Sequence, residues 1–137
     1  MAYLAVLEPC TFKSRLTLDE LTKALREFAE ERATASVRES HSLKNYSFRE
    51  EDGMVHLVPP GGSPVGTHYC DRLLAEFISC VIEKGYWTTL ELIGEDGQRW
   101  GYFITAGKVE PLGWLKVVWK GQKPVPLERA TARLKRK

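Results

Sequence analysis

Two segments with the same Glu-Asp-Gly core, at 51–53 and 95–97, each lie between two runs rich in apolar residues. An Asp-Gly pair favours a type I′ turn, because both central residues of that turn have positive φ, and such turns join antiparallel strands. The pattern therefore predicts two β-hairpins, at 45–58 and 88–105. A chain with two hairpins must build at least part of its core on antiparallel sheet.

A two-residue loop at Asp-Gly also fixes which residues face each other across each hairpin. The apolar pairs expected from this register are Phe48 with Leu57, Ile93 with Trp100, and Leu90 with Phe103. Each pair brings two apolar side chains together, as a buried sheet face requires. In the second hairpin Trp100 and Tyr102 fall on one face of their strand and Phe103 on the other.

A capping box marks the start of a helix that we expect at 17–33. Thr17 is the expected N-cap, and Glu20 stands three positions later, where its side chain reaches back to the N-cap backbone. Leu16 and Leu21 occupy the positions of a hydrophobic staple. The apolar residues of this segment recur at helical spacing and predict its buried face: Leu18, Leu21, Leu25, Phe28 and Ala29.

A second helix is expected to begin near Thr67, after a loop at 59–66 that contains three Pro and three Gly. Gly85 suits the left-handed position that follows the last turn of many helices. The apolar face of this helix is broad enough to predict packing against a sheet. It consists of Leu73, Leu74, Phe77, Ile78, Val81 and Ile82.

Strands expected at 2–8 and 114–120 complete the order β-α-β-β-α-β-β-β. This order predicts an α+β domain with a mainly antiparallel sheet of five or six strands and both helices on one face. The chain of 137 residues is the size of one ordinary domain. We place that domain at 1–121 and a basic C-terminal arm, with a short helix at 127–135, at 122–137.

Charge is distributed unevenly along the chain. Of its 20 basic and 18 acidic residues, eight basic residues and one acidic residue lie from Lys116 onward, which gives this segment a charge of +7 and the preceding residues −5. The basic residues are Lys116, Lys120, Lys123, Arg129, Arg133, Lys135, Arg136 and Lys137. Such a segment suits contact with phosphates, and the aromatic residues Trp114 and Tyr102 would suit base stacking. We therefore expect a non-enzymatic binding or regulatory domain whose arm engages an anionic partner, such as nucleic acid.

Two other functions stay open at this point. The loop at 59–70 leads into a helix, and Gly61, Gly62, Thr67 and His68 would form a small-ligand or enzymatic site there. The loop is not a P-loop, because it lacks the G-x-x-x-x-G-K-[ST] pattern and contains no Lys. Alternatively, an exposed edge strand would pair with a second copy of the chain and form a homo-oligomer.

Cys10, Cys70 and Cys80 are an odd number of cysteines without regular spacing. This is typical of reduced thiols in a cytoplasmic protein rather than of a disulfide framework. His68 and Cys70 are the one closely spaced pair of zinc-ligand types, whereas zinc sites usually show two such pairs. We therefore expect no metal, and we expect Cys70 and Cys80 to lie in the core. Catalytic signatures are missing, and we expect no cofactor. The apolar stretches are too short to cross a bilayer, and a signal peptide's basic n-region is missing.

Overall fold

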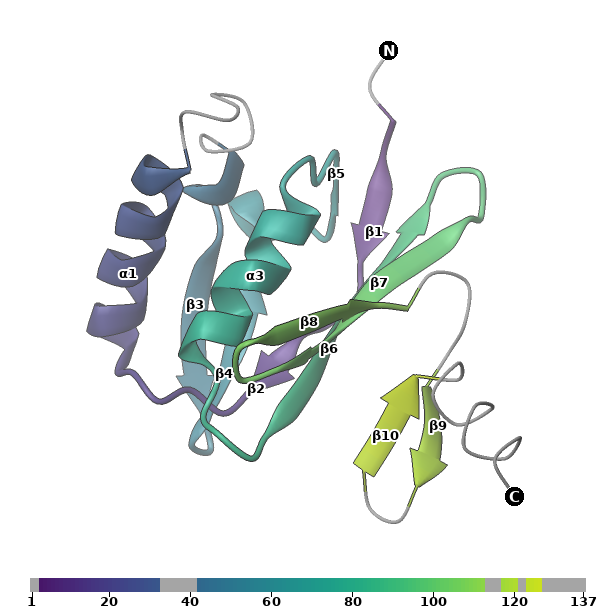
Figure 1. The fold of residues 1–137 in the computed structure, drawn as a ribbon. Coiled ribbons are helices and arrows are strands. Elements are labelled where there is room, and N and C mark those ends of the chain that lie inside the picture. Colours follow the sequence, from purple (N-terminus) through teal and green to yellow (C-terminus); the bar gives the residue numbers. More distant parts are fainter. Residues whose placement is uncertain (1–2, 33–41, 113–116, 121–122, 127–137) are drawn as a thin grey trace.

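The computed structural model of the protein describes residues 3–32, 42–112, 117–120 and 123–126. Figure 1 shows how its helices and strands are arranged. In chain order the elements are β1 (Ala5–Leu7), β2 (Thr11–Phe12), α1 (Leu18–Glu31), β3 (Ser47–Glu51), β4 (Met54–Val58), the 3₁₀ turn η1 (Pro60–Gly62), β5 (Val65–Gly66), α3 (Asp71–Val81), β6 (Trp87–Gly94), β7 (Arg99–Thr105), β8 (Lys108–Pro111), β9 (Val117–Lys120) and β10 (Lys123–Pro126).

The strands form antiparallel sheets, and the expected α+β class is confirmed. A five-stranded sheet has the order β5-β1-β6-β7-β8, a three-stranded sheet has the order β2-β4-β3, and β9 pairs with β10. The strands are thus divided between sheets rather than placed in one. The division occurs after β1: Glu8 N donates to Glu91 O of the first sheet, whereas Cys10 O accepts from Leu57 N of the second. Pro9 between them has no N–H to continue the first ladder.

Four strands, β2, β5, β8 and β10, were not expected from the sequence. Strands β2 and β5 have two residues each, which is too short for any periodic pattern to predict. Strand β8 follows a tight turn in which Gly107 has a φ of +77°, and it pairs with β7 along its length. These short strands set the edges of the sheets, with β5 and β8 at the two edges of the larger one.

The first helix begins as the capping box predicts. The Thr17 side chain accepts from Glu20 N at 3.2 Å, and the Glu20 carboxylate accepts from Thr17 N at 2.9 Å. Leu21, Leu25 and Ala29 are buried on the inner face of α1, and Leu16 packs against the same core. The hydrogen bonds from Thr17 hold the pKa of Glu20 below its ordinary value, so that this carboxylate stays charged at the positive end of the helix.

We expect Thr17→Ala to lower the free energy of unfolding by about 1 kcal/mol, within a range of 0.5–2 kcal/mol, because it leaves a helix N–H without its acceptor. Urea denaturation measures the difference. Thr22→Ala is the matched control: Thr22 is an exposed residue inside the same helix, where Ala has the higher helix propensity. Equal losses of stability in the two variants would show that the cap contributes nothing.

The second helix is shorter than expected at both ends. It begins at Asp71 rather than near Thr67, because His68 has a φ of +47°, which no helical residue adopts. It ends at Val81, because the extended Ile82 forms a β-bridge with Ser14. Gly85, expected to end the helix, has a φ of +92° in a separate turn closed by Tyr86 N and Glu83 O at 3.1 Å.

The first hairpin has the expected register, and the second does not. Asp52 and Gly53 both have positive φ, and Phe48 lies opposite Leu57. In the second hairpin the loop has three residues, since Gly94 N donates to Gln98 O at 2.7 Å and only Gly97 has positive φ. Every pair is shifted by one residue: the partners are Ile93 with Arg99, Leu92 with Trp100, and Leu90 with Tyr102. The predicted pairs Ile93–Trp100 and Leu90–Phe103 are therefore wrong.

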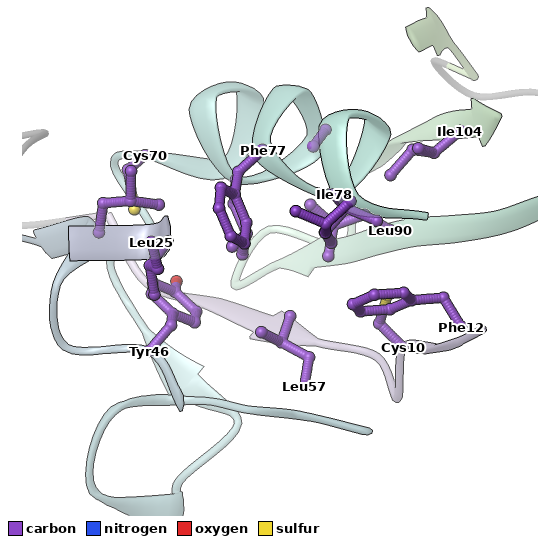
Figure 2. Packing of buried hydrophobic residues seen from close by; sticks show 14 of the residues in the cluster. Cys10, Phe12, Leu25, Tyr46, Leu57, Cys70, Phe77, Ile78, Leu90 and Ile104 are labelled. Atoms are coloured by element: carbon purple, nitrogen blue, oxygen red, sulfur yellow. The ribbon is translucent and has the colours of Figure 1, made fainter. Parts of the chain in front are cut away.

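The two sheets share one core, and Phe77 of α3 lies at its centre (Figure 2). Helix α1 lies against β3, whereas α3 lies against β7 and β8 (Figure 1). The Phe77 ring is 1% exposed, with centroid distances of 5.5 Å to Phe28 of α1 and 6.0 Å to Phe48 of β3. Phe77 therefore packs against both α1 and β3, and its burial is confirmed.

The C-terminal part of the structure is the hairpin of β9 and β10, in which Lys120 lies opposite Lys123. The boundary that we drew between 121 and 122 thus falls between two paired strands. Strand β9 lies inside the strand expected at 114–120, and the short helix expected at 127–135 lies outside the described residues. Within the described ranges, neither helix has the length and apolar character that a bilayer crossing requires.

Candidate functional site

A cavity of about 210 Å³ opens between the turn that precedes β3 and the loop that precedes α3. The turn is closed by hydrogen bonds from Asn45 N to Ser42 O and from Tyr46 N to Leu43 O. The loop is the Gly/Pro-rich segment that the sequence singled out. The residues that line the cavity are Ser42, Asn45, Tyr46, Pro60, Ser63, Val65, Gly66, Thr67 and His68.

His68 connects the walls of this cavity. Its Nε2 lies 2.9 Å from Pro64 O, and its Nδ1 lies 2.5 Å from the Tyr46 hydroxyl. A carbonyl oxygen can only accept, so Nε2 donates to Pro64 O, and in the neutral form of the ring Nδ1 carries no proton. Nδ1 is then an acceptor, and the Tyr46 hydroxyl donates to it. Both ring nitrogens of His68 are therefore engaged in holding the loop to the turn.

Tyr46 and His68 are both buried, at 4% and 7% exposure. Burial, together with nearby Cys70 and Asp71, raises the pKa of Tyr46 far above its ordinary value, so that its hydroxyl remains a hydrogen-bond donor. Figure 2 shows Tyr46 among the core residues. The left-handed φ of His68 costs about 1–3 kcal/mol in a residue with a side chain, and its two side-chain hydrogen bonds hold it there.

The structure brings together two of the four loop residues proposed for a ligand site. Thr67 and His68 line the cavity. Gly61 and Gly62 do not line it: they are exposed, with φ of +66° and +75°, and belong to the turn η1. Sequence reasoning missed Ser42, Asn45 and Tyr46, which come from a separate part of the chain. Only the tertiary contact between His68 and Tyr46 reveals that they belong to the same site.

Tyr102, proposed for base stacking, lies on the inner face of β7. Its ring is half-buried against the core, and its hydroxyl donates to Asp71 Oδ2 at 3.2 Å. Trp100 Nε1 donates to the same oxygen at 2.7 Å. Burial raises the pKa of Tyr102 well above its ordinary value, and the Asp71 carboxylate raises it further. Asp71 thus ties the start of α3 to the larger sheet, a role that no sequence pattern indicates.

The basic residues proposed as a binding surface are only partly within the structure. Lys120 and Lys123 lie in β9 and β10, where they are opposite each other in the register of the two strands. The others lie outside the described residues, together with Trp114: Lys116, Arg129, Arg133, Lys135, Arg136 and Lys137.

None of the three cysteines forms a disulfide bond. Cys10 and Cys70 are buried, and burial raises the pKa of the Cys10 thiol to about 12. Cys80 is exposed on α3, so its expected place in the core is wrong. Nowhere in the described part of the chain do three His, Cys, Asp or Glu side chains gather as metal ligands.

Comparison with protein-family models, curated proteins and solved structures finds no match to this chain. Proposals about function therefore depend on the residues of the chain itself.

Proposed function

We propose that the protein is a non-enzymatic binding domain whose basic C-terminal segment, from Lys116 to Lys137, engages an anionic partner such as nucleic acid. The observation that supports this proposal is the separation of charge along the chain, +7 in this segment and −5 in the residues before it. A polyanion releases counterions when basic side chains neutralise its phosphates, which drives association.

The surface of the folded body favours contact through this segment rather than elsewhere. Acidic side chains are exposed along α1 and β3: Asp19, Glu20, Glu27, Glu30, Glu31, Glu50 and Glu51. These carboxylates repel a polyanion from that side of the molecule. Lys120 and Lys123 bring two positive residues to facing positions in the β9–β10 hairpin, where the basic segment begins.

A titration of short single- and double-stranded oligonucleotides, followed by fluorescence anisotropy at low and physiological salt, tests the proposal. The test variant carries Gln in place of Arg129, Arg133, Lys135, Arg136 and Lys137. Substitution is preferable to deletion from 122, which would remove β10. We expect weaker binding and a flatter dependence of log K on log salt, by about 0.7 for each lost phosphate contact with a single strand.

The matched control carries five Lys or Arg to Gln changes at exposed positions of the body: Lys23, Arg26, Lys44, Lys84 and Arg99. It changes the net charge equally but leaves the C-terminal segment intact, so its salt dependence should stay close to that of the parent. Equal losses in both variants would show that only net charge matters. Binding of the parent no tighter than about 10⁻⁴ M would exclude a nucleic-acid partner.

Assembly through an edge strand is less favoured than polyanion binding. Lys108 and Pro111 lie in the edge strand β8, and Arg49 and Glu51 form an ion pair at 2.6 Å on the edge strand β3. Charged side chains and proline at an edge discourage pairing with another chain.

A further inference from the structure

We propose that the cavity between Ser42 and His68 binds a small, uncharged, hydroxylated molecule, of the class of a monosaccharide or a short polyol. This proposal does not depend on the anionic partner of the C-terminal segment, because none of the basic residues of that segment lines the cavity among the residues that the structure describes.

The lining offers hydrogen bonds of both kinds. Ser42, Ser63 and Thr67 contribute hydroxyl groups, and Asn45 contributes an amide. Hydroxyl and amide groups each provide donors and acceptors, as do the hydroxyl groups of a sugar or polyol. Among the described residues, no side-chain hydrogen-bond partner of Asn45 or Thr67 is present. As far as the described part of the chain is concerned, these two groups can therefore bind a ligand.

The lining also argues against a charged ligand. Among the residues that the structure describes, none of the nine that line the cavity is an acid, a Lys or an Arg. The neighbouring Lys44 does not line the cavity and pairs with Glu30 at 3.8 Å. Both nitrogens of His68 are already hydrogen-bonded. A charged group placed here would lose water without gaining an opposite charge from the described lining, which is unfavourable.

The cavity is small and its walls are fixed. Its volume of about 210 Å³ is below the roughly 300–1,000 Å³ typical of pockets for drug-sized ligands. The His68 side chain joins Tyr46 of one wall to Pro64 of the other, and Asp71 N donates to His68 O at 3.2 Å. The loop, the turn and the start of α3 are therefore held together before any ligand arrives, which lowers the entropic cost of binding.

Ligand-observed NMR on the full chain tests the proposal with ribose, glucose, myo-inositol and glycerol as probes, beside ribose 5-phosphate and glucose 6-phosphate. We expect at least one neutral probe to bind with a Kd of about 10 mM or tighter. In a variant with Thr67→Val and Asn45→Ala, we expect the affinity to fall at least about tenfold, because two ligand hydrogen bonds are lost. Thr105→Val, which removes a hydroxyl from β7 outside the cavity, should bind like the parent.

Three outcomes would overturn the proposal. The first is that no neutral probe binds the parent at that concentration. The second is that the Thr67→Val, Asn45→Ala variant binds as tightly as the Thr105→Val control while both keep the parent's melting temperature. The third is that the sugar phosphates bind more tightly than the neutral sugars and lose this gain when the basic residues at 129–137 become Gln. That result would mean that the sugar phosphates bind the basic C-terminal segment through their phosphate group rather than the cavity through their sugar.

Discussion

Phe77→Ala is expected to lower the free energy of unfolding by about 3–5 kcal/mol. The Phe77 ring is 1% exposed and contacts aromatic rings from α1 and from β3. Its removal leaves a cavity between α1, α3 and β3. Phe28 and Phe48, which flank this cavity, belong to α1 and β3. The packing on both sides must therefore rearrange to fill the space, which places the expected loss in the range found for buried aromatic residues.

Urea denaturation followed by tryptophan fluorescence measures this loss. Tyr86→Ala is the matched control, since it also removes an aromatic ring but at a position that is 47% exposed; surface changes of this kind usually stay within about 0.5 kcal/mol. If Phe77→Ala unfolds at the same urea concentration as Tyr86→Ala, then α3 does not present Phe77 to the core.

Gly101→Ala is expected to destabilise the protein by about 1–3 kcal/mol, even though Ala is usually preferred to Gly inside a strand. A Cβ at position 101 would lie 2.5 Å from Leu90 O and 3.1 Å from Glu91 Cα. Both atoms belong to the backbone of β6, which is held by its neighbours on both sides in the five-stranded sheet. Strand β7 or β6 would have to move to admit the methyl group.

Gly94→Ala separates this backbone effect from the mere loss of a glycine. The closest atoms to a Cβ at position 94 belong to the Tyr3 side chain, which is 40% exposed. That ring can rotate away at the cost of its exposed hydrogen bond to Asp96, so a loss of about 1 kcal/mol or less is expected. Thermal or urea denaturation compares the two variants. A Gly101→Ala protein more stable than the parent would mean that β6 and β7 are spaced more widely than described.

Several features of the fold are determined by short stretches of sequence. The capping box at Thr17 is satisfied within four residues of chain, so the start of α1 can be predicted from the local sequence. The Asp52-Gly53 turn and its register likewise follow from local positive φ. The burial of Phe77 follows from helical spacing, because an apolar face must pack against something.

The other Glu-Asp-Gly segment shows where local sequence stops being sufficient. Asp96 accepts hydrogen bonds from the Tyr3 hydroxyl and from Gln98 N, and Glu95 N donates to Leu4 O at 2.9 Å. Tyr3 and Leu4, which are far from this loop in sequence, thus form hydrogen bonds with it in its three-residue conformation. The same three amino acids therefore form a two-residue loop in the first hairpin and a three-residue loop in the second. The longer loop shifts the pairing of the second hairpin by one residue from the predicted register.

The candidate cavity depends on tertiary contacts to an even greater extent. Helix α3 cannot begin before His68, because hydrogen bonds to Tyr46 and Pro64 hold this residue in a left-handed conformation. Neither partner is recognisable from the sequence around His68. Sequence patterns record which side chains prefer the core and where turns form, but hydrogen bonds between distant segments depend on how those segments meet. Contacts of this kind brought the turn before β3 and the loop before α3 together and so assembled the cavity.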